Sequence, residues 1–219
     1  LYAVMANCGY FPKKELLTLR KLGTRLQGHP HREALPGLET TSGPLGSGLS
    51  QASGMALSFK RDKKSNLVFV SCGDGEQDEG NHWEAVMFAG KHKLNNLIAI
   101  TDRNYIQIDG NTEDIMPLDP LDKKYEAFNW NVKVIDGNDM KKILKTLQAS
   151  RKNKNKPLMI IANTIPGKGV DFMEGKFEWH GKPPNEDEAA TSLEEIHAHE
   201  QKERGDWITQ HQKLKPIHK

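Results

Sequence analysis

Two polar side chains with clear chemical potential follow consecutive predicted strands. Asp74 lies in Gly73-Asp-Gly75, directly after the apolar run 67–72, and Asn104 follows the run 97–101. Glycines permit close approach of the backbone to a ligand, and a following helix N-terminus favours an anion such as phosphate. One helix and one strand fill the interval between the two side chains, so both loops are expected at the same edge of a parallel sheet. Carboxylate and amide oxygens, with phosphate oxygens, are what Mg²⁺ prefers.

The alternative is that Asp74 and Asn104 are ordinary turn residues, which are common after strands. An isolated Gly-Asp-Gly favours that alternative, whereas the spacing to Asn104 favours a cation site. The chain has no P-loop sequence, and the glycines of 43–48 do not form a dinucleotide-binding fingerprint. An EF-hand starting at Asp74 would need Gly and Glu at the positions of Glu79 and Ala85, which excludes such a calcium loop.

The elements that position these loops follow from the apolar pattern. Strands are expected at 67–72, 97–101, 131–135 and 158–164, and helices at 12–28, from 47, at 79–94, at 123–128 and after the N-cap Asp139. The first helix would bury a leucine stripe (Leu16, Leu19, Leu22 and Leu26), and the run 67–72 is typical of a strand buried on both faces. Alternating strands and helices predict a doubly wound, mainly parallel α/β sheet with helices on both faces. Its ligands would lie beyond the carboxyl ends of the strands.

Composition narrows the class of protein. The 219 residues carry a formal net charge of +2, with 36% hydrophobic and 27% charged residues. Near-zero charge argues against a nucleic-acid binder, and no apolar run approaches the roughly 20 residues of a membrane span. The two cysteines have no CxxC spacing, which argues against a disulfide scaffold and against a structural zinc site. We expect no nucleic-acid or membrane partner.

We expect one domain over residues 1–185 and a charged helical arm over residues 186–219. Leu1 begins a segment that reads as the inside of a helix, so we expect residues before it to be missing. No signal peptide is visible, and a cytoplasmic location is expected.

Four motifs, in order along the chain, resemble those of the transketolase family, whose cofactor is thiamine diphosphate. They are Gly28-His-Pro30, Thr41-Ser-Gly-Pro-Leu-Gly-Ser-Gly48, the pair Gly73-Asp-Gly-Glu-Gln-Asp-Glu-Gly80 and Asp102-Arg-Asn-Tyr-Ile-Gln-Ile-Asp-Gly110, and Trp179-His-Gly181. The resemblance runs from Leu1 to about Pro184. It covers only the diphosphate-binding domain of the thiamine diphosphate-binding fold, so the chain is similar to the N-terminal subunit of a split transketolase.

The resemblance implies a set of site residues. Asp74, Asn104 and the carbonyl of Ile106 would bind Mg²⁺, for which Ca²⁺ or Mn²⁺ could substitute. The implied cofactor-binding residues are Gly43, Leu45, Gly73, Asp74, Gly75, Glu76, Asn104 and Ile106. Gly75 would lie against the diphosphate, and Gly43 and Leu45 would approach the aminopyrimidine ring.

The implied catalytic residues are His180, His29 and Glu79. Glu79 would reach across a subunit interface towards the glutamate that activates the cofactor, although a first-turn acid also simply favours the helix dipole. The two histidines would line the sugar channel, where an imidazole suits proton transfer. The other histidines are assigned to the surface: His31, His82, His92, His197, His199, His211 and His218.

The implied reaction is two-carbon ketol transfer from a ketose phosphate such as xylulose 5-phosphate to an aldose phosphate such as ribose 5-phosphate, as in the pentose phosphate pathway. A C-terminal subunit with the pyrimidine-binding domain would complete the site, in a heterotetramer, and the face near 83–88 is a candidate interface. The alternatives are another thiamine diphosphate enzyme, a ketol synthase or decarboxylase, and a non-catalytic regulatory subunit of the same fold.

The chain departs from the family pattern at three places. The interval from His29 to Gly43 is one residue longer than usual, and Ser47 replaces a frequent Gln. Further active-site histidines of the family lie upstream of the position that matches Leu1.

Overall fold

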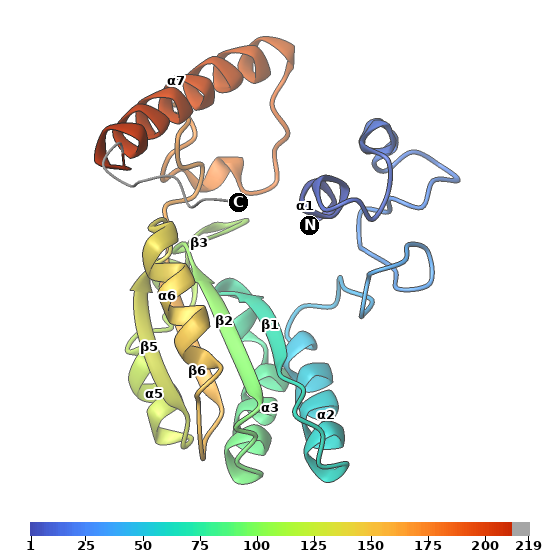
Figure 1. Ribbon diagram of the computed structural model, residues 1–219, viewed down its shortest axis with the longest axis vertical. Helices are drawn as coiled ribbons and strands as arrows, with labels where there is room; N and C mark the ends of the chain where they lie inside the picture. Colours follow the sequence, from blue (N-terminus) through green and yellow to red (C-terminus); the bar gives the residue numbers. More distant parts are fainter. Residues whose placement is uncertain (212–219) are drawn as a thin grey trace, which may run out of the picture.

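The computed structural model describes residues 1–211, and for residue 203 and residues 205–211 it describes only the helical backbone. A sheet of four parallel strands in the order β1-β2-β6-β5 forms its centre (Figure 1). The strands are β1 (Val68–Gly73), β2 (Leu97–Arg103), β5 (Asn131–Asp136) and β6 (Leu158–Asn163). The chain runs outward from β1 through β2 to β5 and then returns, placing β6 between β2 and β5.

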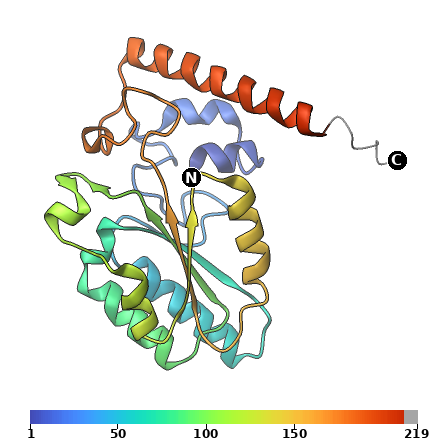
Figure 2. The same cartoon turned by 90° about the vertical axis from the view of Figure 1, so that its left-hand side faces the viewer.

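Helices cover both faces of this sheet (Figure 2). On one face lie α2 (Gly48–Arg61), α3 (Gly80–Lys91) and α5 (Leu121–Ala127), and on the other lies α6 (Met140–Ser150). The carboxylate of Asp139 accepts hydrogen bonds from the backbone N–H groups of Lys141 and Lys142, at 2.9 and 3.1 Å, and so caps α6 as predicted. The predicted doubly wound, parallel α/β sheet is confirmed.

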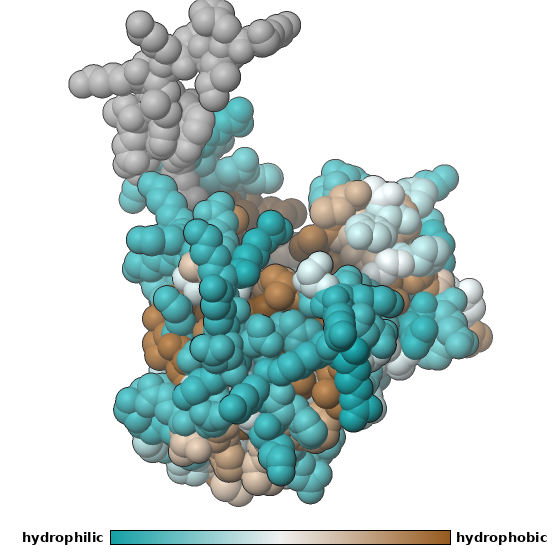
Figure 3. All heavy atoms as spheres, turned by 60° about the horizontal axis from the view of Figure 1, so that its bottom comes forward, coloured by the Kyte–Doolittle hydropathy of each residue, from teal (hydrophilic) through white to brown (hydrophobic). Residues whose placement is uncertain are grey.

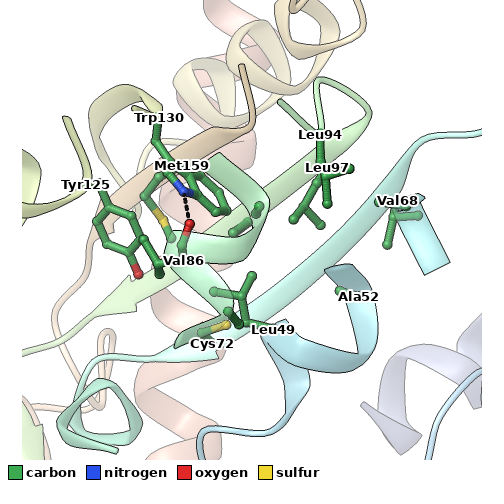
Figure 4. Packing of buried hydrophobic residues seen from close by; sticks show 14 of the residues in the cluster. Leu49, Ala52, Val68, Cys72, Val86, Leu94, Leu97, Tyr125, Trp130 and Met159 are labelled. Atoms are coloured by element: carbon green, nitrogen blue, oxygen red, sulfur yellow. Dashed lines mark hydrogen bonds between the residues drawn. The ribbon is translucent and has the colours of Figure 1, made fainter. Parts of the chain in front are cut away.

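The strands alternate their side chains between two hydrophobic clusters, because successive residues of a strand point to opposite faces. Leu97 and Ala99 pack in the cluster beneath α2, α3 and α5, whereas Ile98 packs with Leu147 on the α6 side. Trp130 fixes the first cluster to α3, since its indole N–H donates to the carbonyl of Val86 at 2.9 Å (Figure 4). The core therefore holds the carboxyl ends of the strands in a defined register.

Shorter elements gather at those carboxyl ends. The 3-10 helix η2 (Gly75–Asp78) follows β1, and β3 (Ile106–Gln107) pairs with β4 (Gly110–Asn111) after β2. Further elements are α4 (Thr112–Ile115) and the 3-10 helix η3 (Phe177–Trp179). Helices α1 (Tyr2–Asn7) and α7 (Glu186–His211) lie at the two ends of the described chain. Figure 1 shows α1 and α7 beyond the carboxyl edge of the sheet.

Helix α7 begins at Glu186, where the charged arm was predicted, and its Glu195 accepts a hydrogen bond from the backbone N–H of Asp171 at 2.8 Å. Residues 212–219 of the arm, including His218, lie outside the described residues, and the division at 185 stays a prediction. Within the described part of the chain, no helix is both long and apolar enough to cross a membrane.

The predicted helix over 12–28 is wrong. Only the 3-10 helix η1 (Lys13–Thr18) forms there, followed by turns in which Arg20 and Gly23 have positive φ values of 62° and 77°. Leu26 is buried in a small cluster with Met5 and Leu35, while Leu19 and Leu22 are exposed. The leucines of this cluster come from separate turns of the chain. Their helical spacing in the sequence therefore does not correspond to one buried face of a helix.

The expectation that β1 is buried on both faces is also wrong. The side chain of Phe69 is 47% exposed and Ser71 is exposed, whereas Val68 and Cys72 are buried against α2 and α3. β1 is an edge strand of the sheet, and α6 packs beside β5 and β6 at the other edge. On the face seen in Figure 3, hydrophobic residues form separate patches on a largely hydrophilic surface.

Candidate functional site

Asp74 is a buried acidic group at the carboxyl edge of the sheet. It caps η2, since its Oδ1 accepts from the backbone N–H of Gly75 at 2.8 Å, and its Oδ2 accepts from the backbone N–H of Tyr105 at 2.7 Å. The residue is 1% exposed. Burial raises the pKa of Asp74, while the two backbone hydrogen bonds and the neighbouring Arg103 act in the opposite direction.

Arg103, at the end of β2, joins Asp74 to the loop that follows. Its Nη1 donates to Asp74 Oδ2 at 3.2 Å and to Thr112 Oγ1 at 2.8 Å. Its Nη2 forms ion pairs with Glu113 and, at 3.3 Å, with Asp119. Burial opposes the charge on Arg103, but these carboxylates outweigh burial and raise its pKa. Arg103 was given no role from the sequence, although its position, two residues after Thr101 on the inward face of β2, could have revealed a buried cation.

The Asn104 turn lies next to Asp74. The amide oxygen of Asn104 accepts from the backbone N–H of Ile106 at 3.0 Å, and Tyr105 between them has a φ of 63°. Since Tyr105 also donates its N–H to Asp74, the turn and the carboxylate are joined directly. Asn104 lines a cavity of about 420 Å³ between the strand ends and α6. Carboxylate, amide and carbonyl oxygens in two touching loops fit a hard cation such as Mg²⁺.

Glu76 connects this region to the glycine-rich loop, residues 41–48. Its Oε2 accepts from the backbone N–H of Gly73 at 2.9 Å, and its Oε1 accepts from that of Gly46 at 3.2 Å. Gly46 has a φ of 78°, which favours glycine, and an added Cβ would lie 2.5 Å from the Cβ of Glu79. The glycine-rich loop is thus held against the first turn after β1.

The first half of the chain contributes a second cavity, of about 830 Å³. Four predicted residues line it together: His29, Gly43, Leu45 and Glu76. Gly43 has a φ of 132°, and an added Cβ would lie 3.1 Å from Cγ of His29, so the histidine packs directly on this glycine. The exposed side chain of Leu45 follows it. These positions could face a flat ring that enters the cavity.

Three further predicted residues lie around these loops. Gly75 sits against Gln107, since an added Cβ would come within 2.9 Å of its Oε1. Glu79 is the exposed N-cap of α3 and makes no side-chain capping hydrogen bond. His180 is exposed and follows η3, which packs on β4. It is not among the residues that line the cavity with His29.

His82 was predicted at the surface, and this is wrong, because it is 0% exposed. Its Nε2 lies 2.6 Å from the hydroxyl oxygen of Tyr125. The Tyr125 hydroxyl donates to Oε1 of Gln77 at 2.8 Å. The amide nitrogen of Gln77 in turn donates to Thr101 Oγ1 and to the carbonyl of Gly73. Position 82 lies four residues before Val86 and so shares the buried face of the helix, and this spacing could have predicted the burial of His82.

The other histidines vary in burial: His31 and His92 are half-buried, His197 and His199 are exposed, and the side chain of His211 is outside the description. On the proposed interface near 83–88, Val86 and most of Trp83 belong to the core, leaving Met87 and Phe88 exposed.

Comparison with known proteins identifies the family. Residues 1–204 match the family described as "Transketolase, thiamine diphosphate binding domain". The chain is 43% identical, over 89% of its length and 70% of the relative, to one of the subunits of the apulose-4-phosphate transketolase of Actinobacillus succinogenes. It is 44% identical, over 90% of its length and 71% of the relative, to 6-deoxy-6-sulfo-D-fructose transketolase subunit SqwG of a Clostridium species.

Longer proteins match as well. Rat transketolase is 40% identical over 93% of the chain and 32% of the relative. The solved transketolase of Campylobacter jejuni superposes with a TM-score of 0.79 at 34% identity, over 84% of this chain. The chain spans about 30% of that solved protein. These matches confirm the family inferred from the motifs: the chain belongs to the transketolase family and carries its thiamine diphosphate-binding domain.

Proposed function

We propose that this chain is the thiamine diphosphate-binding subunit of a two-chain transketolase. The reaction is transfer of a two-carbon ketol unit from a ketose phosphate, such as xylulose 5-phosphate, to an aldose phosphate, such as ribose 5-phosphate. The observation that carries the proposal is the junction of Asp74 with the Asn104 turn through the N–H of Tyr105, which gathers oxygen donors at the carboxyl edge of the sheet.

Asp74, Asn104 and the carbonyl of Ile106 would hold Mg²⁺, or Ca²⁺ or Mn²⁺ in its place, and through it the diphosphate. Bound thiamine diphosphate supplies the nucleophilic carbon that allows a carbon–carbon bond to be broken and formed. The backbone of Gly73 and Gly75 allows the diphosphate to approach, and Glu76 keeps Gly46 and Gly73 in place through its two carboxylate oxygens. Gly43 and Leu45 would orient the aminopyrimidine ring.

The histidines and Glu79 supply the proton chemistry of the proposal. His29 lines the same cavity as Gly43 and Leu45, within reach of a sugar that follows the cofactor into it. His180 lies on a loop after β6 and would donate or accept a proton at the sugar hydroxyls once that loop meets the substrate. Glu79 is exposed, and in this proposal it would meet a group on a second chain.

A partner chain with the pyrimidine-binding domain completes the proposal, as a heterotetramer. One relative is named as a subunit of an apulose-4-phosphate transketolase, and another as a subunit of a 6-deoxy-6-sulfo-D-fructose transketolase. Those names favour a second candidate within the same reaction class, in which the donor is not xylulose 5-phosphate. The donor panel should therefore include ketoses with a phosphate and with a sulfonate.

The test is ketol transfer by this chain purified with its partner, with thiamine diphosphate and Mg²⁺ added. We expect transfer only when both chains are present, and its loss in Asp74→Ala but not in the matched surface variant Asp109→Ala. Unchanged activity in Asp74→Ala would indicate a non-catalytic, regulatory subunit. Loss of transfer in His180→Ala with cofactor still bound supports transketolase, whereas decarboxylation without transfer indicates another thiamine diphosphate chemistry.

A further inference from the structure

Three side chains of metal-ligating type, none of them a proposed Mg²⁺ ligand, lie close together in the elements around Asp74. They are Cys72 at the end of β1, Glu76 in η2 and His82 in the first turn of α3. The thiol sulfur, a carboxylate oxygen and a ring nitrogen lie within 4.8 Å of one another. Cys72 and His82 are buried and Glu76 is half-buried, so this is not a cluster of solvated surface acids.

The hydrogen bonds around His82 determine which ring nitrogen is free. Gln77 is oriented by its amide nitrogen, which donates to the carbonyl of Gly73, so Gln77 Oε1 is the acceptor of the Tyr125 hydroxyl proton. The Tyr125 oxygen must then accept from His82 Nε2–H, across 2.6 Å. In this tautomer Nδ1 carries a lone pair.

That lone pair has no hydrogen-bond partner among the described residues, although the ring is fully buried. Unpartnered buried polar atoms are rare in native proteins and need a reason. Burial lowers the pKa of His82 to about 4, so the imidazole is neutral near pH 7. A neutral imidazole whose second nitrogen donates to an oxygen is the usual form of a metal-bound histidine.

We propose that Cys72, Glu76 and Nδ1 of His82 bind a thiophilic divalent cation of the Zn²⁺ class, at a site separate from the Mg²⁺ ligands. Sulfur, nitrogen and carboxylate oxygen are the donor set of such cations, and hard cations avoid sulfur. Binding releases one proton, from the Cys72 thiol to the solvent. Three protein ligands leave the fourth tetrahedral position to water.

The site is coupled to the glycine-rich loop through Glu76. The Glu76 carboxylate holds the N–H groups of Gly46 and Gly73, and a cation bound between Cys72 and His82 would draw the carboxylate towards itself. The bond to Gly46 is the longer one, at 3.2 Å, and we expect it to open first. Hydrogen exchange of the Gly46 amide should therefore become faster when the cation binds.

The test uses the full chain after dialysis against a chelator, with Co²⁺ as the spectroscopic probe and Zn²⁺ as the competitor. We expect one equivalent of Co²⁺ to give a thiolate-to-cobalt charge-transfer band that Zn²⁺ removes and excess Mg²⁺ does not. Cys72→Ser and Cys72→Ala should both lose the band, and His82→Gln should weaken Co²⁺ binding at least about tenfold. Cys8→Ser and His92→Gln are the matched controls and should bind like wild type.

Two outcomes would overturn the proposal. One is Co²⁺ binding without a thiolate band, which indicates histidines or acids elsewhere in the chain. The other is a band that survives in Cys72 variants whose circular dichroism matches the wild type. Asp74→Asn should leave the band intact, which separates this site from failure of the Mg²⁺ site.

Discussion

Two parts of the candidate site are built differently. One is the Asp74 region, which consists of Asp74, Arg103 and the Asn104 turn, and the other is the pair of loops that carry His29 and His180. Asp74 and Arg103 are each 1% exposed and their polar atoms are bonded to neighbouring strands and loops. His29 and His180 are exposed, and they follow glycine-rich or irregular segments. Under the proposed function, the part of the site that would bind the charged cofactor is fixed by buried contacts, whereas the part that would meet the sugar lies on accessible loops.

This difference has a simple physical origin. The buried residues follow directly from parallel strands, whose ends are held by the core, whereas the histidines are separated from the nearest strand by long stretches of loop. Preorganisation of charge is most effective where water is excluded, and substrate access requires the opposite. Substitutions in the buried Asp74 region and substitutions in the exposed histidine loops should therefore change different properties of the protein.

The largest stability effect is expected from Arg103→Met. Methionine keeps much of the volume, but it leaves the buried Asp74 without its cation and removes the ion pair of the half-buried Glu113. Removing one partner of a buried ion pair costs about 3–5 kcal/mol, so the free energy of unfolding should fall by that amount. Urea unfolding measures it, with exposed Arg151→Met as the control. A loss below about 1 kcal/mol would mean that the Asp74 region is not held by this charge.

A somewhat smaller effect is expected from acid, through His82. Its pKa is about 4 in the folded chain and 6.5 ordinarily, so the unfolded chain binds a proton that the folded chain resists. Stability is full above pH 6.5 and falls as the pH drops towards 4, by about 3 kcal/mol in total. Between pH 6.5 and pH 4, the free energy of unfolding of the metal-free wild type should fall by about 3 kcal/mol more than that of His82→Gln. The control His92→Gln should behave like the wild type. Parallel pH profiles for all three proteins would contradict the burial of His82.

Patterns in the sequence predict much of the fold and of the candidate site, but not all of either. The four strands and α6 with its Asp139 cap followed from apolar runs and a capping residue, which are local signals. The prediction of a helix over 12–28 failed because Leu26 is buried in a small separate cluster with Met5 and Leu35, which lie outside that segment. The uncovered face of β1 at Phe69 likewise depends on sheet order, which local pattern does not encode.

The candidate site shows the same division between features that local sequence patterns predict and features that depend on tertiary contacts. Asp74 and Asn104 were predicted at one edge because the carboxyl ends of parallel strands meet there, and Asp74 accepts from the N–H of Tyr105, the residue after Asn104. Arg103 and His82 were missed, although strand and helix periodicity each placed them on an inward face. The role of Glu76 as a bridge between two loops required coordinates, because Gly46 lies thirty residues before it.

Glu76→Gln should have an intermediate effect, since it acts on the link between the two regions. The amide oxygen can still accept from Gly73 or Gly46, but the charge that strengthens both bonds is lost. We expect a loss of about 1–2 kcal/mol in the free energy of unfolding. Faster hydrogen exchange at Gly46 than at Gly73 would accompany it, and the exposed Glu84→Gln is the control. Equal protection of Gly46 in both variants would show that the loop is held by other contacts.

The smallest stability effect, and the sharpest contrast, is expected from His29→Asn and His180→Asn. Both side chains are exposed, so the free energy of unfolding should change by no more than about 0.5 kcal/mol. Ketol transfer by the complex should nevertheless fall by about 10²-fold, the usual contribution of one general acid or base. Thiamine diphosphate affinity should stay near wild type, because neither side chain joins the Asp74 region. If affinity falls together with activity, these loops help hold the cofactor, and the separation between a fixed cofactor side and an accessible sugar side is wrong.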